Sequence, residues 1–222
     1  MIGHRALSPR VTELTLAIEG DEPFRWLAGQ HVTLRPDLPG RESSAFSIAA
    51  APNQAGLKEL TLAVANGAEL LEHADIGARV AVDGPFGTLT WHPAPGALLA
   101  GAGTGLAPLR AIVHGALAAD ENTPITLVAG NRREGDLLWH GELLALAAEH
   151  PRFRYEPVLS LPGPGYAGRL GHVQDHFADA AGRLPRGFHS YLCGSTRMVD
   201  ACREALGKLG VGPERISSEA DA

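Results

Sequence analysis

Three glycines fall within five positions of the stretch 100–113, which reads AGAGTGLAPLRAIV. They are Gly101, Gly103 and Gly105, and Thr104 lies between the last two. Glycine accepts a positive φ and leaves the main chain bare, so a ligand can approach it closely. An apolar run before the loop predicts a strand, and the leucine spacing after it predicts a helix with Pro108 in its first turn. Because a helix start presents free N–H groups that favour an anion, the stretch predicts a phosphate site.

The loop differs from the common phosphate-binding fingerprints. The sixth position of G-x-G-x-x-G is Leu106, and the next expected strand ends at Ala129 without the acidic residue of that motif. No Gly-Lys-Ser/Thr sequence follows, as a Walker A loop requires. A tight strand-to-helix turn without a ligand is the alternative interpretation, although three glycines exceed what such a turn needs.

Length and composition indicate a globular protein. The chain has 222 residues, of which 45% are hydrophobic and 20% charged, enough for one large or two small domains. A net charge of −6 without a basic stripe argues against nucleic acid as a partner. We find no apolar run of 18 residues and no leader-like start, so we expect neither a membrane span nor a signal peptide. Two cysteines, Cys193 and Cys202, make no disulfide framework and predict a cytoplasmic protein.

Two hydrophobic periods divide the chain. Apolar residues alternate with period two up to about residue 90, which predicts a small antiparallel β-barrel that contains a short helix at 69–74. Later segments alternate between strand and helix, which predicts a doubly wound α/β domain with a five-stranded parallel sheet. The expected strands lie near 97–100, 124–129, 153–159, 188–193 and 214–218, and the expected helices near 106–119, 136–149, 171–180 and 196–209. We place the two domains at 1–94 and 95–222, because the prolines around this point suit a stiff connection.

Five motifs in this order resemble those of the ferredoxin–NADP reductase superfamily, which includes stand-alone flavin reductases and reductase components of oxygenases. They are AGQH at 28–31, SAFSIA at 44–49, GPFG at 84–87, GAGTGLAP at 101–108 and LCGSTRMV at 192–199. The resemblance runs nearly end to end. It implies a flavin, FAD or FMN, on the barrel and NAD(P)H on the parallel sheet. Hydride transfer requires the two rings to stack, so the two domains must face each other.

The resemblance also implies roles for individual residues. Ser47 would hydrogen-bond near flavin N5, Cys193 would lie beside the nicotinamide, and Glu219 is a further catalytic candidate. The implied flavin-binding residues are Ser44, Ala45, Phe46, Ser47, Ile48, Gly67 and Ala68. The implied nucleotide-binding residues are Gly101, Gly103, Thr104, Gly105, Pro108, Arg132, Gly194, Ser195 and Met198. A small buried hydrophobe is the alternative interpretation of Cys193. Arg132 and Arg133 could meet a 2′-phosphate, but arginine is frequent there with either nucleotide, so NADH and NADPH both stay open.

The flavin motifs depart from the family pattern where phosphate should bind. Ser44 stands in place of an arginine, and Leu70 in place of a serine. Arg35 and Arg41 lie nearby but out of register. We therefore expect FAD or FMN to bind loosely unless one of these arginines reaches the phosphate.

Other residue patterns give weaker evidence for a functional site. His172 and His176 lie four apart, but a third zinc ligand is missing, so we expect a solvated helix face and no metal site. Any iron–sulphur centre would have to belong to a partner, because this chain has only two cysteines.

Three functions remain open. The first is an NAD(P)H:flavin oxidoreductase that takes flavin as substrate or loose cofactor, which the missing phosphate contacts favour. The second is a reductase component with bound FAD that feeds a separate ferredoxin or oxygenase. The third is a non-redox nucleotide-binding protein whose flavin site has decayed.

Overall fold

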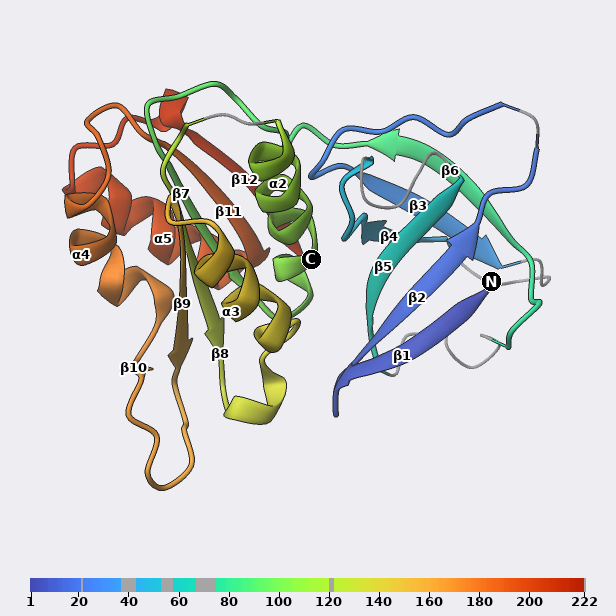
Figure 1. Ribbon diagram of the computed structural model, residues 1–222, viewed down its shortest axis with the longest axis horizontal. Coiled ribbons are helices and arrows are strands. Elements are labelled where there is room, and N and C mark those ends of the chain that lie inside the picture. The colour runs from blue at the N-terminus through green and yellow to red at the C-terminus, as the bar shows by residue number, and fades with distance from the viewer. Residues whose placement is uncertain (21, 37–42, 53–57, 67–74, 120–121, 222) are drawn as a thin grey trace.

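The computed structural model describes residues 1–20, 22–36, 43–52, 58–66, 75–119 and 122–221. Its first half consists of two three-stranded antiparallel sheets, in the orders β1-β2-β5 and β4-β3-β6 (Figure 1). A bridge between Ile48 and Leu62 joins the two sheets into a six-stranded barrel. The strands are β1 (Gly3–Ser8), β2 (Val11–Ala17), β3 (His31–Pro36), β4 (Ser44–Ser47), β5 (Glu59–Ala65) and β6 (Val80–Phe86).

Alternation of apolar residues explains the barrel. Leu14 and Leu16 on β2 face inward with Leu60 and Leu62 on β5, and all four are buried in one core cluster. The period-two pattern of the sequence is therefore the inward-facing set of each strand. The helix expected at 69–74 lies outside the described residues.

The second half is a six-stranded parallel sheet in the order β10-β9-β8-β7-β11-β12. Its strands are β7 (Ala97–Ala102), β8 (Ile125–Asn131), β9 (Phe153–Leu159), β10 (Arg169–Leu170), β11 (His189–Ser195) and β12 (Ile216–Asp221). Its helices are α2 (Leu106–Ala118), α3 (His140–Glu149), α4 (Phe177–Gly182) and α5 (Thr196–Lys208), with the short 3₁₀ turns η2 (Gly103–Gly105), η3 (Glu134–Asp136), η4 (Val173–His176) and η5 (Pro213–Arg215). The predicted doubly wound α/β fold is confirmed.

Three details differ from the sequence-based expectation. The sheet has a sixth strand, β10, whose two residues at the edge are too few to make an apolar pattern. The helix expected from residue 136 begins only at His140, because Trp139 before it takes a left-handed conformation with φ of 50°. The helix expected at 171–180 is divided into η4 and α4.

Helices cover both faces of the parallel sheet. Figure 1 shows α2 and α3 on the face toward the barrel and α4 and α5 on the opposite face. One core cluster spans the two halves and includes Val11 and Leu89 of the barrel half with Ile112 of α2. Gly29 has φ of +101°, and a Cβ there would lie 1.9 Å from the carbonyl oxygen of Leu89. The AGQH motif therefore supplies a glycine where a side chain would collide with the backbone at Leu89, beside Ile112 of α2.

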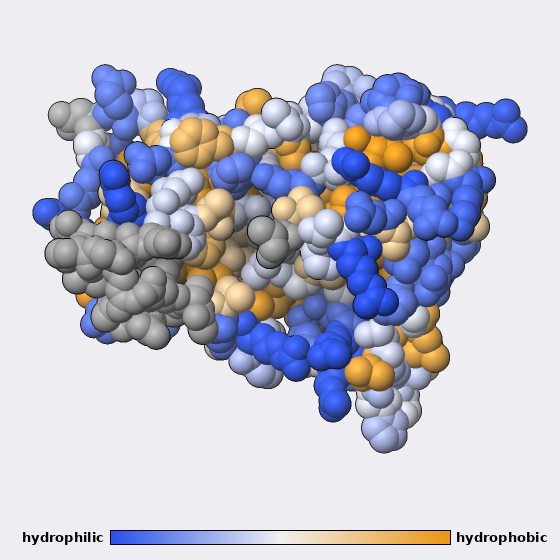
Figure 2. Space-filling model, turned by 180° about the vertical axis from the view of Figure 1, so that it is seen from behind, coloured by the Kyte–Doolittle hydropathy of each residue, from blue (hydrophilic) through white to orange (hydrophobic). Residues whose placement is uncertain are grey.

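The segment between β9 and β10 projects from the parallel half (Figures 1 and 2). Leu161 and Leu170 near its base are 53% and 55% exposed. None of the described helices is long and apolar enough to cross a membrane.

Candidate functional site

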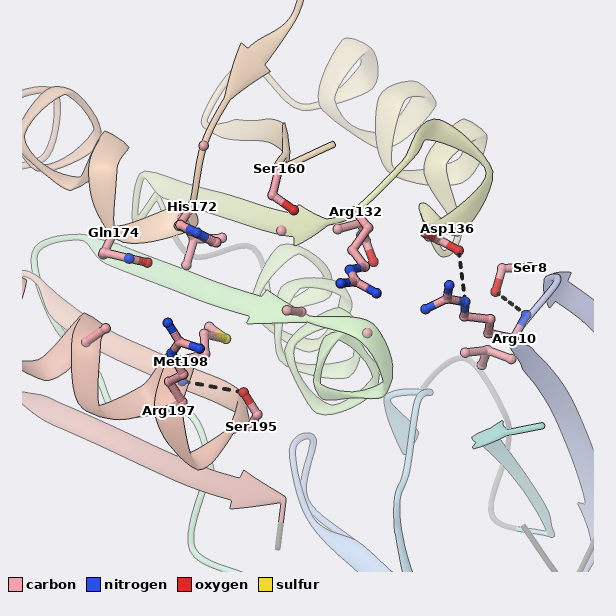
Figure 3. A pocket seen from close by; sticks show the side chains of 18 residues that line it. Ser8, Arg10, Arg132, Asp136, Ser160, His172, Gln174, Ser195, Arg197 and Met198 are labelled. Carbon is pink, nitrogen blue, oxygen red and sulfur yellow. Dashed lines mark hydrogen bonds and ion pairs between the residues drawn. The ribbon is translucent and has the colours of Figure 1, made fainter. Parts of the chain in front are cut away.

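A cavity of about 550 Å³ opens at the carboxyl edge of the parallel sheet (Figure 3). Strand order reverses beside β7, since β8 lies on one side and β11 on the other, and ligands of α/β sheets bind at such a point. The cavity is lined by Ser8, Arg10, Val11, Ala102, Gly103, Gly130, Asn131, Arg132, Asp136, Ser160, Gly171, His172, Val173, Gln174, Ser195, Arg197, Met198 and Ala201. Four predicted nucleotide-binding residues are among them: Gly103, Arg132, Ser195 and Met198.

The three glycines of the loop are needed for different structural reasons. Gly103 has φ of +56°, lines the cavity, and leaves open space where a Cβ would stand. A Cβ on Gly105 would lie 2.4 Å from the carbonyl oxygen of Cys193, and one on Gly101 would lie 2.6 Å from Cδ1 of Leu109. Gly103 therefore exposes the main chain to a ligand, whereas Gly101 and Gly105 allow the loop to pack against β11 and α2. A bulky side chain at Gly105 would disturb folding as well as nucleotide binding.

The start of α5 lies beside this loop. The Ser195 hydroxyl accepts a hydrogen bond from the N–H of Met198 at 3.4 Å and caps the helix. Gly194 has φ of +151°, and a Cβ there would lie 2.7 Å from the sulphur of Met198. The LCGSTRMV motif thus forms a second close wall of the cavity. Thr104 and Pro108 lie on η2 and α2 rather than on the lining itself.

Arginines dominate the charge of the cavity. Arg10, Arg132 and Arg197 line it, whereas Arg133 does not. Among the described lining residues, Asp136 carries the one carboxylate, and it lies 3.9 Å from Nε of Arg10. Sequence reasoning missed Arg10 and Arg197. Arg10 gave no signal because it belongs to the β1–β2 turn of the other half.

The sequence predicts a solvated helix face with His172 and His176. The structure agrees only in part, because His172 is exposed but His176 is in contact with neighbouring residues. His172 lines the cavity, at the N-terminal end of η4. His176 instead contacts Nη1 of Arg169 at 3.1 Å and the carbonyl oxygen of Leu170 at 2.9 Å.

The three predicted catalytic residues lie along one line of neighbours. Cys193 on β11 pairs in register with Gly101 on β7 and with Glu219 on β12. An oxygen of Glu219 lies 2.9 Å from Nδ1 of His31, and His31 pairs with Ser47 across β3 and β4. Residues that face each other across a ladder share a face of the sheet. The structure therefore connects the nucleotide loop to the flavin motif through the end of β12.

This line contains polar atoms that suit a bound molecule. Oε2 of Glu219 and Nδ1 of His31 are buried and lack a hydrogen-bond partner among the described residues. Nδ1 of His31 lies 2.9 Å from Oε1 of Glu219, which is close enough for an ion pair, but the two groups are not aligned for a hydrogen bond. Gly87 makes room for the pair, because a Cβ there would lie 2.8 Å from Nδ1 of His31. Buried polar atoms without partners are costly, so these atoms fit the polar edge of a flavin ring.

The rest of the flavin motif is partly described. Phe46 packs against the barrel core and stays partly exposed, so its stacking on a flavin remains a prediction. Ser44 and Ala45 are exposed, and Ile48 is fully buried. Arg35 lies 3.8 Å from Asp83 in an exposed ion pair. Gly67, Ala68 and Leu70 lie outside the described residues, as does Arg41.

Cys193 lies at the end of β11 as predicted, but its side chain is 1% exposed within the core cluster shared with α2. This burial agrees with the interpretation of Cys193 as a small hydrophobe. Its proposed place beside the nicotinamide stays a prediction.

A buried charge network joins α2, α3 and the flavin motif. Arg110 on α2 donates from Nη1 to the carbonyl oxygen of Ala49 at 2.6 Å and from Nε to Glu142 at 2.8 Å. Its guanidinium lies 5.1 Å from the ring centre of Trp139, and His114 lies 2.7 Å from the same Glu142 oxygen. Burial opposes ionisation of Glu142, yet hydrogen bonds and charges from His114 and Arg110 hold its pKa below the ordinary value of 4.5.

Comparisons with known proteins agree with this geometry. Residues 99–204 match the family model described as the oxidoreductase NAD-binding domain. Ferredoxin–NADP reductase B of Sorangium cellulosum is 36% identical, over 99% of this chain and 95% of that protein. The ferredoxin–NAD(P)+ reductase component of a naphthalene 1,2-dioxygenase system of Pseudomonas putida is 31% identical, over 92% of this chain and 63% of that protein. The chain therefore spans about three fifths of that relative.

A solved structure shows the same fold over nearly the whole chain. The crystal structure of an Amycolatopsis cytochrome P450 reductase matches with a TM-score of 0.87 and 31% identity, covering 99% of this chain and 67% of that one. The end-to-end relative from Sorangium, the nucleotide-type cavity and the motif order agree with one another. The chain belongs to the ferredoxin–NADP reductase superfamily and is an oxidoreductase.

Proposed function

We propose that this chain is an NAD(P)H-dependent reductase in which hydride passes from nicotinamide to a flavin on the barrel, and electrons then pass to a separate acceptor. The line from Gly101 through Cys193, Glu219 and His31 to Ser47 carries this proposal. This line joins the glycine loop, which is the predicted phosphate site, to the flavin motif. A nucleotide whose phosphates bind at the loop would therefore extend its nicotinamide toward the barrel.

Residues of the chain divide this work. Gly103 and the start of α5 at Ser195 would hold the diphosphate of the nucleotide. Ser47, His31 and Glu219 would hydrogen-bond the reacting ring and hold a proton beside it. A bound flavin supplies the chemistry that couples a two-electron hydride donor to a one-electron acceptor. We propose 1–94 as the flavin-binding unit and 95–222 as the nucleotide-binding unit.

The names of the relatives indicate the acceptor class. Similar proteins are called reductases of ferredoxin and reductase components of oxygenases. We therefore propose a ferredoxin or an oxygenase as the acceptor. The location in the cytoplasm stays a prediction from the cysteine content.

Use of flavin as a loose cofactor or a substrate is a second candidate with its own observation. Ser44 is exposed and uncharged where the family has an arginine, and Arg35 already faces Asp83. A charge-assisted contact contributes about 1.5–3 kcal/mol, so its loss weakens binding roughly ten- to a hundredfold. On this candidate FAD or FMN is largely lost during purification, and riboflavin binds almost as well as FMN.

One set of measurements tests both candidates. A visible spectrum of the purified chain shows whether flavin stays bound, and calorimetric titration compares FAD, FMN and riboflavin with wild type and with Ser44→Arg. Tight FAD binding with much weaker riboflavin indicates a bound-FAD reductase. Similar constants for all three, with Ser44→Arg tightening only FMN and FAD, indicate loose flavin. Absence of NAD(P)H oxidation under every flavin condition would contradict the reductase function and favour a non-redox nucleotide-binding protein.

A further inference from the structure

The β1–β2 turn of the barrel half contributes a cation to the nucleotide cavity. Arg10 of this turn lines the cavity together with Ser8 at the end of β1, Val11 at the start of β2 and residues of the parallel half. Ser8 is 8% exposed, and its hydroxyl accepts the N–H of Arg10 at 3.1 Å. Val11 is buried in the core cluster that spans both halves. The backbone of Arg10 is therefore fixed, while its side chain is 64% exposed and can reach a ligand.

Among the described residues, the Arg10 side chain has one weak ion-pair partner. Its Nε lies 3.9 Å from Oδ1 of Asp136, beyond hydrogen-bond distance. Arg132 makes no ion pair with any carboxylate of the described residues. In Figure 3 the guanidinium groups of Arg10 and Arg132 extend toward the open centre of the cavity, with Asp136 beside Arg10. Two guanidinium groups against one carboxylate leave this end of the cavity positively charged.

The chemistry of this end suits a phosphate monoester. Strand β8 ends at Asn131 instead of an acidic residue that would accept the ribose hydroxyls of NADH. A guanidinium binds phosphate oxygens through two parallel N–H groups. A phosphate monoester carries about −1.5 to −2 charges at neutral pH, so two arginines balance it.

We propose that Arg10 and Arg132 close on the 2′-phosphate of NADPH from opposite halves of the molecule. Arg10 is then a specificity-determining residue that the flavin-binding half contributes to the nucleotide site. This inference rests on the proposed function, because it assumes that the cavity holds a nicotinamide nucleotide. The phosphate replaces Asp136 as the partner of Arg10, so NADPH also joins the β1–β2 turn to the parallel half.

Calorimetric titration of the purified full chain with 2′,5′-ADP and 5′-AMP tests the proposal without requiring flavin. Wild type should bind 2′,5′-ADP more tightly than 5′-AMP. Arg10→Gln and Arg132→Gln should each lower that preference about tenfold or more. Arg133→Gln is the matched control, since it removes the same charge beside Arg132 but outside the cavity lining, and it should keep the preference. Asp136→Asn should keep or raise it by removing a competing anion.

The outcomes are distinct. Equal affinities for the two ligands in wild type, or equal preferences in Arg10→Gln and Arg133→Gln, would overturn the role of Arg10. A loss of preference in Asp136→Asn as large as in Arg10→Gln would show that the ion pair is structural and would also overturn it. Anaerobic flavin reduction by NADH is measured alongside. If it proceeds while the preference fails, the reductase function stands without this clamp, and if neither ligand binds and NADH is not oxidised, both proposals fail.

Discussion

Replacing Arg110 with methionine should lower the free energy of unfolding, because Arg110 connects the flavin motif of the barrel half to α3 of the parallel half. Arg110 is 12% exposed and joins the carbonyl oxygen of Ala49, the last residue of the flavin motif, to Glu142 on α3. Methionine fills much of the same space and removes the charge. The Ala49 carbonyl then loses its side-chain donor, and Glu142 keeps only His114.

The magnitude follows from these contacts. Removing one partner of a buried ion pair costs about 3–5 kcal/mol. Glu142 is 33% exposed, so water recovers part of that cost, and we expect a loss of about 2–3 kcal/mol in the free energy of unfolding. With a urea dependence of about 1–3 kcal/mol per molar, the unfolding midpoint should fall by roughly 0.7–3 M.

The loss should depend on pH in a defined direction. A carboxyl whose pKa is lowered on folding contributes stability above its ordinary value, and this contribution disappears as pH falls through the folded pKa. The pKa of Glu142 is lowered from 4.5, so the difference between wild type and Arg110→Met should be full at neutral pH and shrink below 4.5.

Urea unfolding followed by circular dichroism, at neutral pH and below pH 4.5, measures this effect. Arg110→Lys is the conservative control, because it keeps the charge but not the fork that reaches Ala49 and Glu142 together. It should fall between wild type and Arg110→Met. Equal midpoints for all three proteins, or a difference that stays constant below pH 4.5, would refute the assigned role of Arg110.

Two further predictions concern the nucleotide loop and the catalytic line. Gly103→Ala should cost about 1–2 kcal/mol for its positive φ and lose nucleotide affinity in a titration, whereas Gly105→Ala should lower the melting temperature further than Gly103→Ala does, because its Cβ meets the Cys193 backbone. Equal melting temperatures of the two variants would contradict this distinction. Ser47→Ala and Glu219→Gln should each slow flavin reduction in stopped flow more than they weaken flavin binding, and more than Cys193→Ala does, since Cys193 is buried. Wild-type rates in both variants would remove them from the catalytic line.

Local periodicity was enough to predict the main elements of the fold. Alternation marked the inward faces of the barrel strands, and short apolar runs marked the central parallel strands. Strand β10 escaped prediction because two residues carry no period. The late start of α3 depends on Trp139, which is held by its 2.7 Å hydrogen bond to Glu13 of the barrel half, and a contact of this kind has no local signature.

Site residues were predictable where a motif fixes the backbone. Gly103 and Ser195 belong to such turns and line the cavity, and their binding of a nucleotide stays a prediction. His31, Arg10 and Arg110 were not assigned roles, because each acts through a contact between the two halves. His31 stands inside the AGQH motif, yet its pairing with Glu219 depends on where β12 ends.

The two arginines that connect the halves differ in a way that matches their proposed roles. Arg110 is buried and held at 2.6–2.8 Å, so breaking its contacts to admit a ligand would cost several kcal/mol. Arg10 is mostly exposed, and its contact with Asp136 at 3.9 Å is of the kind that contributes about 0–1 kcal/mol, less than a charge-assisted bond to phosphate. The interface is therefore rigid beside the flavin motif and adjustable at the far end of the nucleotide cavity. The two arginines share no partner. The double variant should therefore lose as much nucleotide preference as Arg10→Gln alone, and as much unfolding free energy as the sum of the losses in the two single variants.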